Sequence, residues 1–596
     1  MKNTILKILL CVALLFLVPC ITFSAQNPSQ YENKISIKNS IKHFDRGEVH
    51  YFDGIPVIKL EGSYYNMGLQ YGVLMKKELN QVAIEVNTFR DDIIASYPFL
   101  LRPIIPLFVN SMLNDMKKRI PEYYLDEIRG ISEGSGLDFN TILFMAVGGG
   151  LMDTSACTAM LVKLNDRIIH GRNFDWEPPL LAKYPAIVKY CPVGKKSFTS
   201  FSFVGFPGVV HAVNENKLSL TLNIAAYMYK KDNTGLPITF KTREILENAS
   251  NLKTAGDVIR KYKTDEPGWM ITIGSANEMN GAIFEMYDNN ITETPMKGKY
   301  EYVHNILFQP ELVGNMELSK KYNEVFLGQS EENIPRHYTT ERIINEKGIN
   351  SVEDMLDYLR NVDFYEYKNV YMTYVSTINN EMTVNTLIFD LKNDLIYFAV
   401  APGYSAFTKM YQYDLKNRTL TLFKDADPRM ETPELKDKMN WYYNYKKLQY
   451  RGEFKKILEQ TDFSRDLGPS QLKFIKEAWE EEKAVKPEIL VSGIDKQIAK
   501  YPNYGMLYLL KADVLKESGK DNDAVVNYEH ALATPYLSNQ FRLEILSKLA
   551  KINEKENPNL AKDQMQHYCA LIDELRKTHH IDEKLEKDYK KFKKKL

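Results

Sequence analysis

A cysteine, an arginine and an aspartate lie close together in one stretch whose residue types could carry out acyl chemistry. Residues 154–178 are T-S-A-C-T-A-M-L-V-K-L-N-D-R-I-I-H-G-R-N-F-D-W-E-P, and Cys157 is one of only five cysteines in the chain. A thiolate attacks carbonyl carbons, and a nearby guanidinium such as that of Arg172 lowers a thiol pKa. A lone cysteine is more often a small buried hydrophobe. The G-R-N-F-D-W sequence that follows favours a nucleophile instead.

The residues around Cys157 predict a β-hairpin that would bring these groups together. Residues 158–162 form a short apolar run, 165–167 have turn composition, and a second apolar run begins at Ile168. Strand, tight turn and strand is the pattern of a hairpin, whose two strands lie within hydrogen-bonding distance. Arg172 and Asp175 on the second strand are therefore expected beside Cys157 on the first. If Cys157 began a mature chain, its own α-amine, with an ordinary pKa of about 8, could act as the base.

Two motifs resemble a known family. C-T-x-M-L-V followed by D-R-I-I-H-G-R-N-F-D-W is similar to the peptidase C45 branch, which is typified by acyl-coenzyme A:6-aminopenicillanic acid acyltransferases. This branch is part of the choloylglycine hydrolase and acid ceramidase group of N-terminal nucleophile hydrolases. G-S-Y-Y-N-M-G-L-Q-Y-G at residues 62–72 is a second match. The resemblance covers roughly residues 55–405 and implies an α+β fold, the four-layer αββα sandwich of these hydrolases.

The resemblance also implies roles for the hairpin residues. Cys157 would be the nucleophile, Arg172 would stabilise its thiolate or contact substrate, and Asp175 would orient the α-amine of Cys157. That amine is free only if the Ala156–Cys157 bond is cut, which the family does autocatalytically. We therefore expect fragments 26–156 and 157–596 that stay associated, since family-like motifs lie on both sides of the cut.

Three more site residues follow from the resemblance. Asn223 lies at the end of L-S-L-T-L-N and would donate to the oxyanion. Asn305, in Y-V-H-N-I-L-F, matches a second family asparagine, although His304 stands where the family usually has threonine. Arg336, in I-P-R-H-Y-T-T-E-R, matches a late family arginine, with Arg342 as the alternative. Taken singly, each is typical of a surface or turn, so their assignment depends on their order relative to Cys157.

Other candidate motifs carry less weight. Residues 130–134 fit the G-x-S-x-G pattern of a serine nucleophile, but that motif requires a strand before it and a helix after it, and here the spacing is helical. Gly148–Gly150 either eases cleavage before Cys157 or forms an ordinary loop. His170 and His304 are not expected to act as general bases, because the mechanism supplies its own amine. We find no H-E-x-x-H and no C-x-x-C, so neither a metal nor a cofactor is predicted.

The remaining pattern predicts the elements that position these residues. Ser63 is suited to cap a helix that begins near Tyr64, with Gly68 and Gly72 allowing close packing. Further helices are expected within 80–145, including 123–131 with a stop at 134–136, and at 241–263 and 353–362. Strands are expected at 55–60, 186–190, 200–204, 209–213, 218–222, 269–273, 281–286, 300–307, 370–378, 383–390 and 395–400.

Length and composition suggest several parts. The chain has 596 residues, with 77 basic and 77 acidic side chains, so it lacks the basic excess of a nucleic-acid-binding protein. Residues 1–25 have the charged start, apolar core and small-residue end of a secretory signal, with retention as a membrane anchor as the alternative. We divide the rest into 26–156 and 157–430, the two parts of the hydrolase domain, and 431–596. Removal of the signal leaves three cysteines, an odd number that suggests a free thiol.

Residues 431–596 are predicted to form an all-α domain. Six positions match a tetratricopeptide repeat: Tyr508, Ala512, Leu515, Ala524, Tyr528 and Ala531. Stacked repeats normally number about three or more, so one clear repeat predicts only a repeat-like domain. It would dock a protein partner or, alternatively, form a helical cap on the hydrolase.

Three functions stay open on this basis. The first is an exported hydrolase, periplasmic or secreted, that cleaves the C–N bond of a small, linear N-acyl amide, including lipid-like ones. The second is an acyltransferase that passes the acyl group to an amine. The third is a non-catalytic exported binding protein that acts through its helical tail. Both enzyme hypotheses require that the Cys157 sulfur be reachable from solvent and close to the arginine and aspartate of R-N-F-D.

Overall fold

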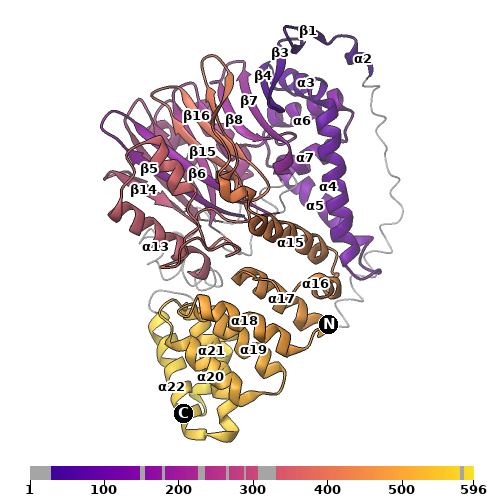
Figure 1. The fold of residues 1–596 in the computed structure, drawn as a ribbon. Helices are drawn as coiled ribbons and strands as arrows, with labels where there is room; N and C mark the ends of the chain where they lie inside the picture. The colour runs from indigo at the N-terminus through magenta and orange to yellow at the C-terminus, as the bar shows by residue number, and fades with distance from the viewer. Residues whose placement is uncertain are drawn as a thin grey trace.

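The computed structural model describes residues 29–147, 155–177, 181–225, 235–263, 268–287, 290–305, 330–576, 581 and 583–596. Two β-sheets with helices on their outer faces form the upper body in Figure 1, and a helical region lies below them. The predicted signal segment 1–25 and Gly148–Gly150 lie outside the described residues. Within the described parts of the chain, no helix combines the length and the apolar composition needed to cross a bilayer.

The larger sheet has eleven strands, and all its neighbours are antiparallel except one parallel pair, β4 and β7. In spatial order they are β1 (Ser36–Lys38), β2 (Ile41–Phe44), β3 (Gly47–Phe52), β4 (Ile55–Gly62), β7 (Pro185–Pro192), β8 (Phe198–Phe203), β9 (His211–Asn214), β10 (Leu218–Ala225), β11 (Gly268–Ser275), β12 (Asn280–Tyr287) and β13 (Asn290–Pro295). The parallel pair joins a strand before Cys157 to one after it, so both predicted fragments share this sheet.

The smaller sheet has seven strands, with the predicted hairpin near its centre. Its order is β14 (Tyr300–Val303), β5 (Ser155–Lys163), β6 (Ile168–Trp176), β15 (Thr383–Asp390), β16 (Leu395–Val400), β17 (Met410–Asp414) and β18 (Thr419–Lys424). β5 and β6 contact β10 and β11 of the larger sheet. Buried apolar side chains from both sheets, such as Phe201 and Phe389, fill the space between them.

Helices cover both outer faces. On the larger sheet lie α3 (Tyr64–Leu74), α8 (Ile238–Asn248) and α9 (Leu252–Lys261), with α4 (Lys76–Ser96), α5 (Ile104–Lys117), α6 (Glu122–Ser135) and α7 (Phe139–Val147) packed beside them. On the smaller sheet lie α13 (Ser330–Glu346) and α14 (Val352–Leu359). A short helix, α2 (Ser29–Glu32), precedes the first strand. The predicted αββα order is confirmed.

Glycines set the closest helix contact, between α3 and α6. The Ser63 side chain accepts a hydrogen bond from the Asn66 N–H, which confirms the predicted cap. A Cβ added at Gly68 would lie 2.0 Å from the Glu127 carbonyl oxygen, and one added at Gly134 would lie 2.7 Å from that of Leu69. The glycines of the G-x-S-x-G sequence therefore serve helix packing, and Ser132 lies within α6, which excludes a nucleophile elbow there.

Three sequence-based predictions differ from the structure. The strand predicted at 300–307 is β14, which ends at Val303. Residues 370–378 form no strand; the segment is irregular, for a reason given below. The strand predicted at 209–213 is β9, which begins only at His211. Six strands at or near the sheet edges were not predicted: β1, β2, β3, β13, β17 and β18. Short and partly exposed strands carry little apolar periodicity.

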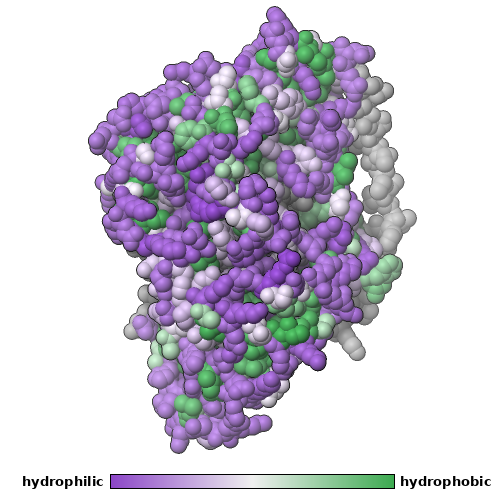
Figure 2. Space-filling view, viewed as in Figure 1, coloured by the Kyte–Doolittle hydropathy of each residue, from purple (hydrophilic) through white to green (hydrophobic). Residues whose placement is uncertain are grey.

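The C-terminal region is helical, as predicted. It contains α15 (Pro433–Tyr450), α16 (Phe454–Gln460), α17 (Pro469–Glu482), α18 (Pro487–Lys500), α19 (Gly505–Glu517), α20 (Asp521–Ala533), α21 (Asn539–Glu556), α22 (Pro558–Leu575) and α23 (Glu583–Lys593). Successive helices pack in pairs such as α19 with α20, and the tetratricopeptide assignment stays a prediction. α15 lies between the sandwich and the other helices (Figure 1). The face in Figure 2 is mostly hydrophilic, with apolar side chains in small separate groups.

Candidate active site

The hairpin places Arg172 against the sulfur of Cys157. In the β5–β6 register, Cys157 pairs with Phe174, Ala159 pairs with Arg172, and Ala156 pairs with Asp175. Cross-strand neighbours on one face of an antiparallel pair lie within contact distance. Arg172 Nη2 donates to Cys157 Sγ at 3.3 Å, and both side chains are buried. The structure thus brings the predicted thiol and guanidinium together.

Asp175 lies on the other face of β6, beside the Ala156–Cys157 peptide. Its carboxylate accepts hydrogen bonds from Thr383 Oγ1 at 2.7 Å and from Asn380 Nδ2 at 2.9 Å. Burial raises the pKa of Asp175, while Arg336, these two donors and Arg172 act in the opposite direction. Neither donor was identified from the sequence, because N-N-E-M-T carries no signal that links it to a strand 200 residues earlier in sequence order.

Asn305 and Arg336 converge on the main chain of Cys157. The Cys157 N–H donates to Asn305 Oδ1 at 2.7 Å, and Arg336 Nη1 donates to the Cys157 carbonyl oxygen at 2.9 Å. Asn333, which sequence reasoning missed, accepts from Arg336 Nη2 at 2.7 Å and from the Asn305 N–H at 2.9 Å. Its position three residues before Arg336 on α13 places the two on one helix face, a spacing that could have revealed it. Arg342 instead pairs with Asp363 at 2.7 Å.

Asn223 lies close to the site, but its amide is engaged elsewhere. It occupies the expected strand β10, where its Nδ2 donates to the His304 carbonyl oxygen at 3.0 Å. The preceding carbonyl, that of Leu222, lies 3.9 Å from Cys157 Sγ. One N–H of this amide is therefore engaged by His304, and the second N–H is the one that could donate to an oxyanion at the sulfur.

The two histidines have structural partners. His170 lies within hydrogen-bonding distance of Ser219 and Thr221, and burial lowers its pKa to about 3. His304 lies 3.0 Å from Thr158 Oγ1, and burial lowers its pKa well below the ordinary value. Both imidazoles are therefore neutral near pH 7. Among the described residues, no group of His, Cys, Asp and Glu side chains is arranged to hold a metal ion.

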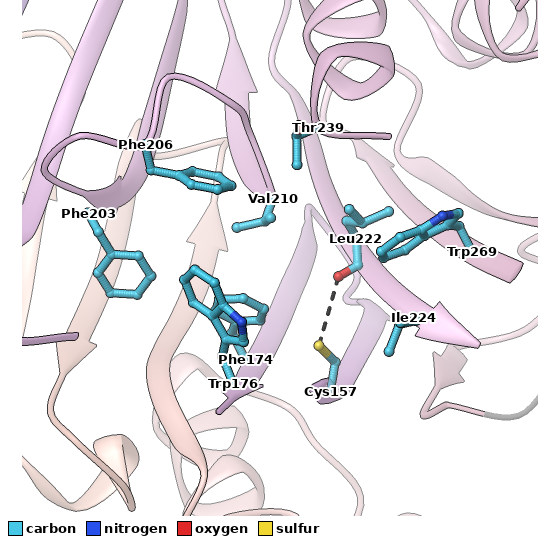
Figure 3. A pocket seen from close by; sticks show the side chains of 10 residues that line it. All are labelled: Cys157, Phe174, Trp176, Phe203, Phe206, Val210, Leu222, Ile224, Thr239 and Trp269. Carbon is cyan, nitrogen blue, oxygen red and sulfur yellow. Dashed lines mark hydrogen bonds between the residues drawn. The ribbon is translucent and has the colours of Figure 1, made fainter. Parts of the chain in front are cut away.

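The sulfur faces an apolar cavity (Figure 3). Its walls are mainly aromatic and aliphatic: Phe174, Trp176, Phe203, Phe206, Val210, Leu222, Ile224, Thr239 and Trp269. The cavity volume is only about 20 Å³, enough for about one water molecule, and Cys157 is 1% exposed. Burial raises the thiol pKa, and Arg172 opposes that shift. The uncut chain thus meets the requirement for a nearby guanidinium but not the one for an accessible sulfur.

Comparisons with known proteins point to the same group of hydrolases. The family model for acyl-coenzyme A:6-aminopenicillanic acid acyl-transferase matches residues 162–403. Acid ceramidase of Rattus norvegicus is 25% identical over 193 residues, 28% of this chain and 48% of that protein. The N-acylethanolamine-hydrolyzing acid amidase of Caenorhabditis elegans is 26% identical over 169 residues, 25% of this chain and 47% of that protein.

A solved structure of the Caenorhabditis elegans N-acylethanolamine-hydrolyzing acid amidase ortholog aligns at 17% identity over 39% of this chain and 93% of its own, with a TM-score of 0.28. The chain spans about half the length of the curated relatives it matches. The family model and these curated relatives therefore show which group of proteins part of this chain resembles.

Proposed function

We propose that this protein is a cysteine N-terminal nucleophile hydrolase that cleaves the C–N bond of linear N-acyl amides through a thioester at Cys157. The observation that carries the proposal is the 3.3 Å contact between Arg172 and the Cys157 sulfur, inside an apolar cavity. A guanidinium at that distance favours the thiolate, and apolar walls suit an acyl chain. Because the walls are apolar, we extend the proposal to a lipid-like acyl group.

Activation by cleavage of the Ala156–Cys157 bond forms part of the proposal. In the uncut chain the Cys157 nitrogen is an amide, and its N–H is held by Asn305. Cleavage would turn that nitrogen into an amine positioned between Asn305 and Asp175. We place substrate access after cleavage, because the sulfur of the uncut chain is only 1% exposed.

Two contacts favour fragments that stay together after the cut. β4 and β7 pair along their main chains from opposite sides of Cys157. The buried Arg243 guanidinium, on α8, pairs at 2.8 Å with the Glu127 carboxylate, on α6. A sheet ladder and a desolvated ion pair both cross from fragment 26–156 to fragment 157–596.

The reaction follows from these positions. The Cys157 α-amine takes the thiol proton, and the thiolate adds to the amide carbonyl. The oxyanion is stabilised by amide donors, for which the second N–H of Asn223 Nδ2 is the candidate. A preorganised donor is worth about 10²–10³ in rate. The C–N bond breaks, the leaving amine receives the proton from the α-ammonium, and a thioester remains. Water then adds, with the α-amine as base, and releases the acid and the thiol.

Mass spectrometry of the purified chain tests this function. The expected result is two fragments that end at Ala156 and begin at Cys157, and a mass increase on the second fragment when an N-acyl substrate is trapped. Cys157→Ala should remain one chain and hydrolyse no amide. Hydrolysis of N-acyl amides by Cys157→Ala would refute the proposal. Export through residues 1–25 belongs to the same proposal and is checked by the N-terminus of the mature protein.

An acyltransferase is the second candidate, because the matched family model bears that activity in its name. The two functions share the thioester and differ only in the acceptor. Adding a primary amine to the assay separates them. A transferase yields the new amide at the expense of the free acid, whereas a hydrolase yields the free acid at an unchanged rate.

A further inference from the structure

The carboxylate of Asp175 depends on a segment with a costly backbone. Its two donors, Asn380 and Thr383, lie at the end of residues 360–383, which join α14 to β15. Five non-glycine residues in this segment have positive φ: Tyr365 at 52°, Asn369 at 54°, Met372 at 59°, Tyr374 at 48° and Val375 at 54°. Such conformations persist only where surrounding structure holds them.

The start of α17 holds one side of this segment. The Ser470 N–H donates to the Met372 carbonyl oxygen at 2.8 Å, and the Ser470 hydroxyl lies 2.5 Å from that oxygen and 3.1 Å from Glu381 Oε1. The same carboxylate oxygen accepts from the Tyr374 N–H at 2.8 Å. A Cβ added at Gly468 would lie 2.7 Å from that of Met372. The helix therefore sits directly on the strained backbone.

α15 holds the other side. Lys446 Nζ lies 2.6 Å from Glu177 Oε1, and the Tyr450 hydroxyl donates to the same oxygen at 2.9 Å. The side chains of Lys446 and Glu177 are 9% and 1% exposed. Glu177 comes directly after β6, and the Trp176 N–H donates to the Met382 carbonyl oxygen at 2.9 Å. This contact ties the end of the catalytic hairpin to the strained segment.

Aromatic packing connects α13, the helix that carries Arg336, to the segment 360–383 and to the C-terminal helices. The ring of Tyr338, on α13, lies 5.7 Å from that of Tyr365 and 6.3 Å from that of Tyr536. Tyr365 and Tyr536 are stacked at 3.9 Å, and Tyr536 follows α20. Residues of the segment 360–383 thus share one hydrophobic core with the C-terminal helices.

We propose that α15 and α17 belong to the scaffold of the active site, with Lys446 and Ser470 as positioning residues. Lys446 holds Glu177, Ser470 holds Glu381 and Met372, and together they keep Asp175 beside Cys157. The proposal rests on the proposed function and extends it to a part of the chain outside the family match. The residues of α15 and α17 that make these contacts are buried against the hydrolase domain. In the proposal these two helices therefore cap that domain and do not offer the same residues to a docking partner.

The test uses the full chain with Lys446→Met and, separately, Ser470→Ala. A matched control is Lys447→Met, which changes the neighbouring, exposed lysine of the same helix, and Lys446→Arg tests rescue by charge. Small displacements of a reacting group cost about 10²-fold in rate. We expect kcat for an N-acyl amide to fall about 10- to 100-fold in both variants, with KM within about twofold, and Lys446→Arg to recover most of it.

A second measurement does not depend on substrate. Asp175 raises the thiol pKa of Cys157, so its displacement should move the pH profile of Cys157 alkylation by iodoacetamide to lower pH. If the parent protein hydrolyses no N-acyl amide, the proposed function fails. The inference is then decided by a pH titration of Cys157 thiolate absorbance, which requires no reagent to reach the buried sulfur. Profiles and kcat values equal to those of Lys447→Met would overturn the inference. If Lys446→Met does not fold, Ser470→Ala, which removes one oxygen atom, gives the answer.

Discussion

Replacing Arg172 by methionine should raise the pKa of the Cys157 thiol strongly. The guanidinium nitrogen lies 3.3 Å from the sulfur, and Arg172 is fully buried. At an effective dielectric constant of about 20, two unit charges at this distance attract by about 5 kcal/mol. At 1.36 kcal/mol per unit of pKa, that corresponds to an upper limit of about 3–4 units. Because Arg336 also favours the thiolate, we expect a rise of about 2 units.

The assay is a pH titration of thiolate formation by ultraviolet absorbance, with Cys157→Ala measured in parallel to isolate the signal of this thiol. Near pH 7 a rise of about 2 units leaves about 100-fold less thiolate, and kcat should fall in proportion. The Arg172 guanidinium lies over the Phe174 ring, 4.9 Å from its centroid, and methionine replaces it with a flexible, polarizable side chain that packs well against aromatic rings. Loss of packing is therefore smaller than loss of charge.

Arg172→Lys is the matched control, because it retains the positive charge without the planar fork. Its thiol pKa should lie closer to that of the parent protein than to that of the methionine variant. A shift below about 0.5 unit in Arg172→Met, or equal shifts in both variants, would refute the electrostatic reasoning. In either case the 3.3 Å contact between Arg172 and the Cys157 sulfur would have to be explained by packing alone.

The remaining predictions concern the framework. Arg243→Met leaves Glu127 buried without its 2.8 Å partner and should lower the free energy of unfolding by about 3–5 kcal/mol, as measured by urea denaturation. Gly68→Ala would force a Cβ against a main-chain carbonyl and cost about 1–3 kcal/mol or more, whereas Gly298→Ala, in open space, should stay within about 0.5 kcal/mol. Burial raises the pKa of Glu381 above 4.5, so its contribution to stability is lost as pH rises through that higher value. Glu381→Gln should therefore gain stability relative to the parent protein as the pH of the urea titration rises toward neutral.

Local patterns predicted the parts of the site that are close in sequence. Apolar runs and turn residues alone predict the hairpin. They also predict that Cys157 and Arg172 lie close together on its two strands. The cap at Ser63 and the close packing at the glycines of α3 were also predicted from the sequence, because each depends on a local residue pattern with one physical cause. The helix that packs against those glycines, α6, was not predicted, because no local pattern indicates which two helices pack together.

The more distant site residues depended on the family resemblance. Asn305 and Arg336 contact the main chain of Cys157 from positions 148 and 179 residues later in the sequence. No periodicity in the sequence predicts these contacts. Asn223 was placed on the correct strand, yet its amide faces the His304 carbonyl, a detail set by packing between the sheets. Cleavage and export stay predictions, since the described structure is that of the uncut chain.

The segment predicted as a strand at residues 370–378 shows where local reasoning ends. Its alternating apolar residues fit a strand. Several of them are buried, as a strand in the core would be, so the predicted burial is confirmed although the predicted strand is not. The backbone nevertheless departs from strand geometry, because its hydrogen-bond partners do not lie on a neighbouring strand. The Met372 carbonyl accepts from the main chain of α17, and the Met372 and Tyr374 N–H groups donate to the side chains of Tyr404 and Glu381. The same pattern of buried residues is thus compatible with more than one backbone conformation. Here the choice is made by helices almost 100 residues farther along the chain, and the same choice positions the carboxylate on which the proposed chemistry depends.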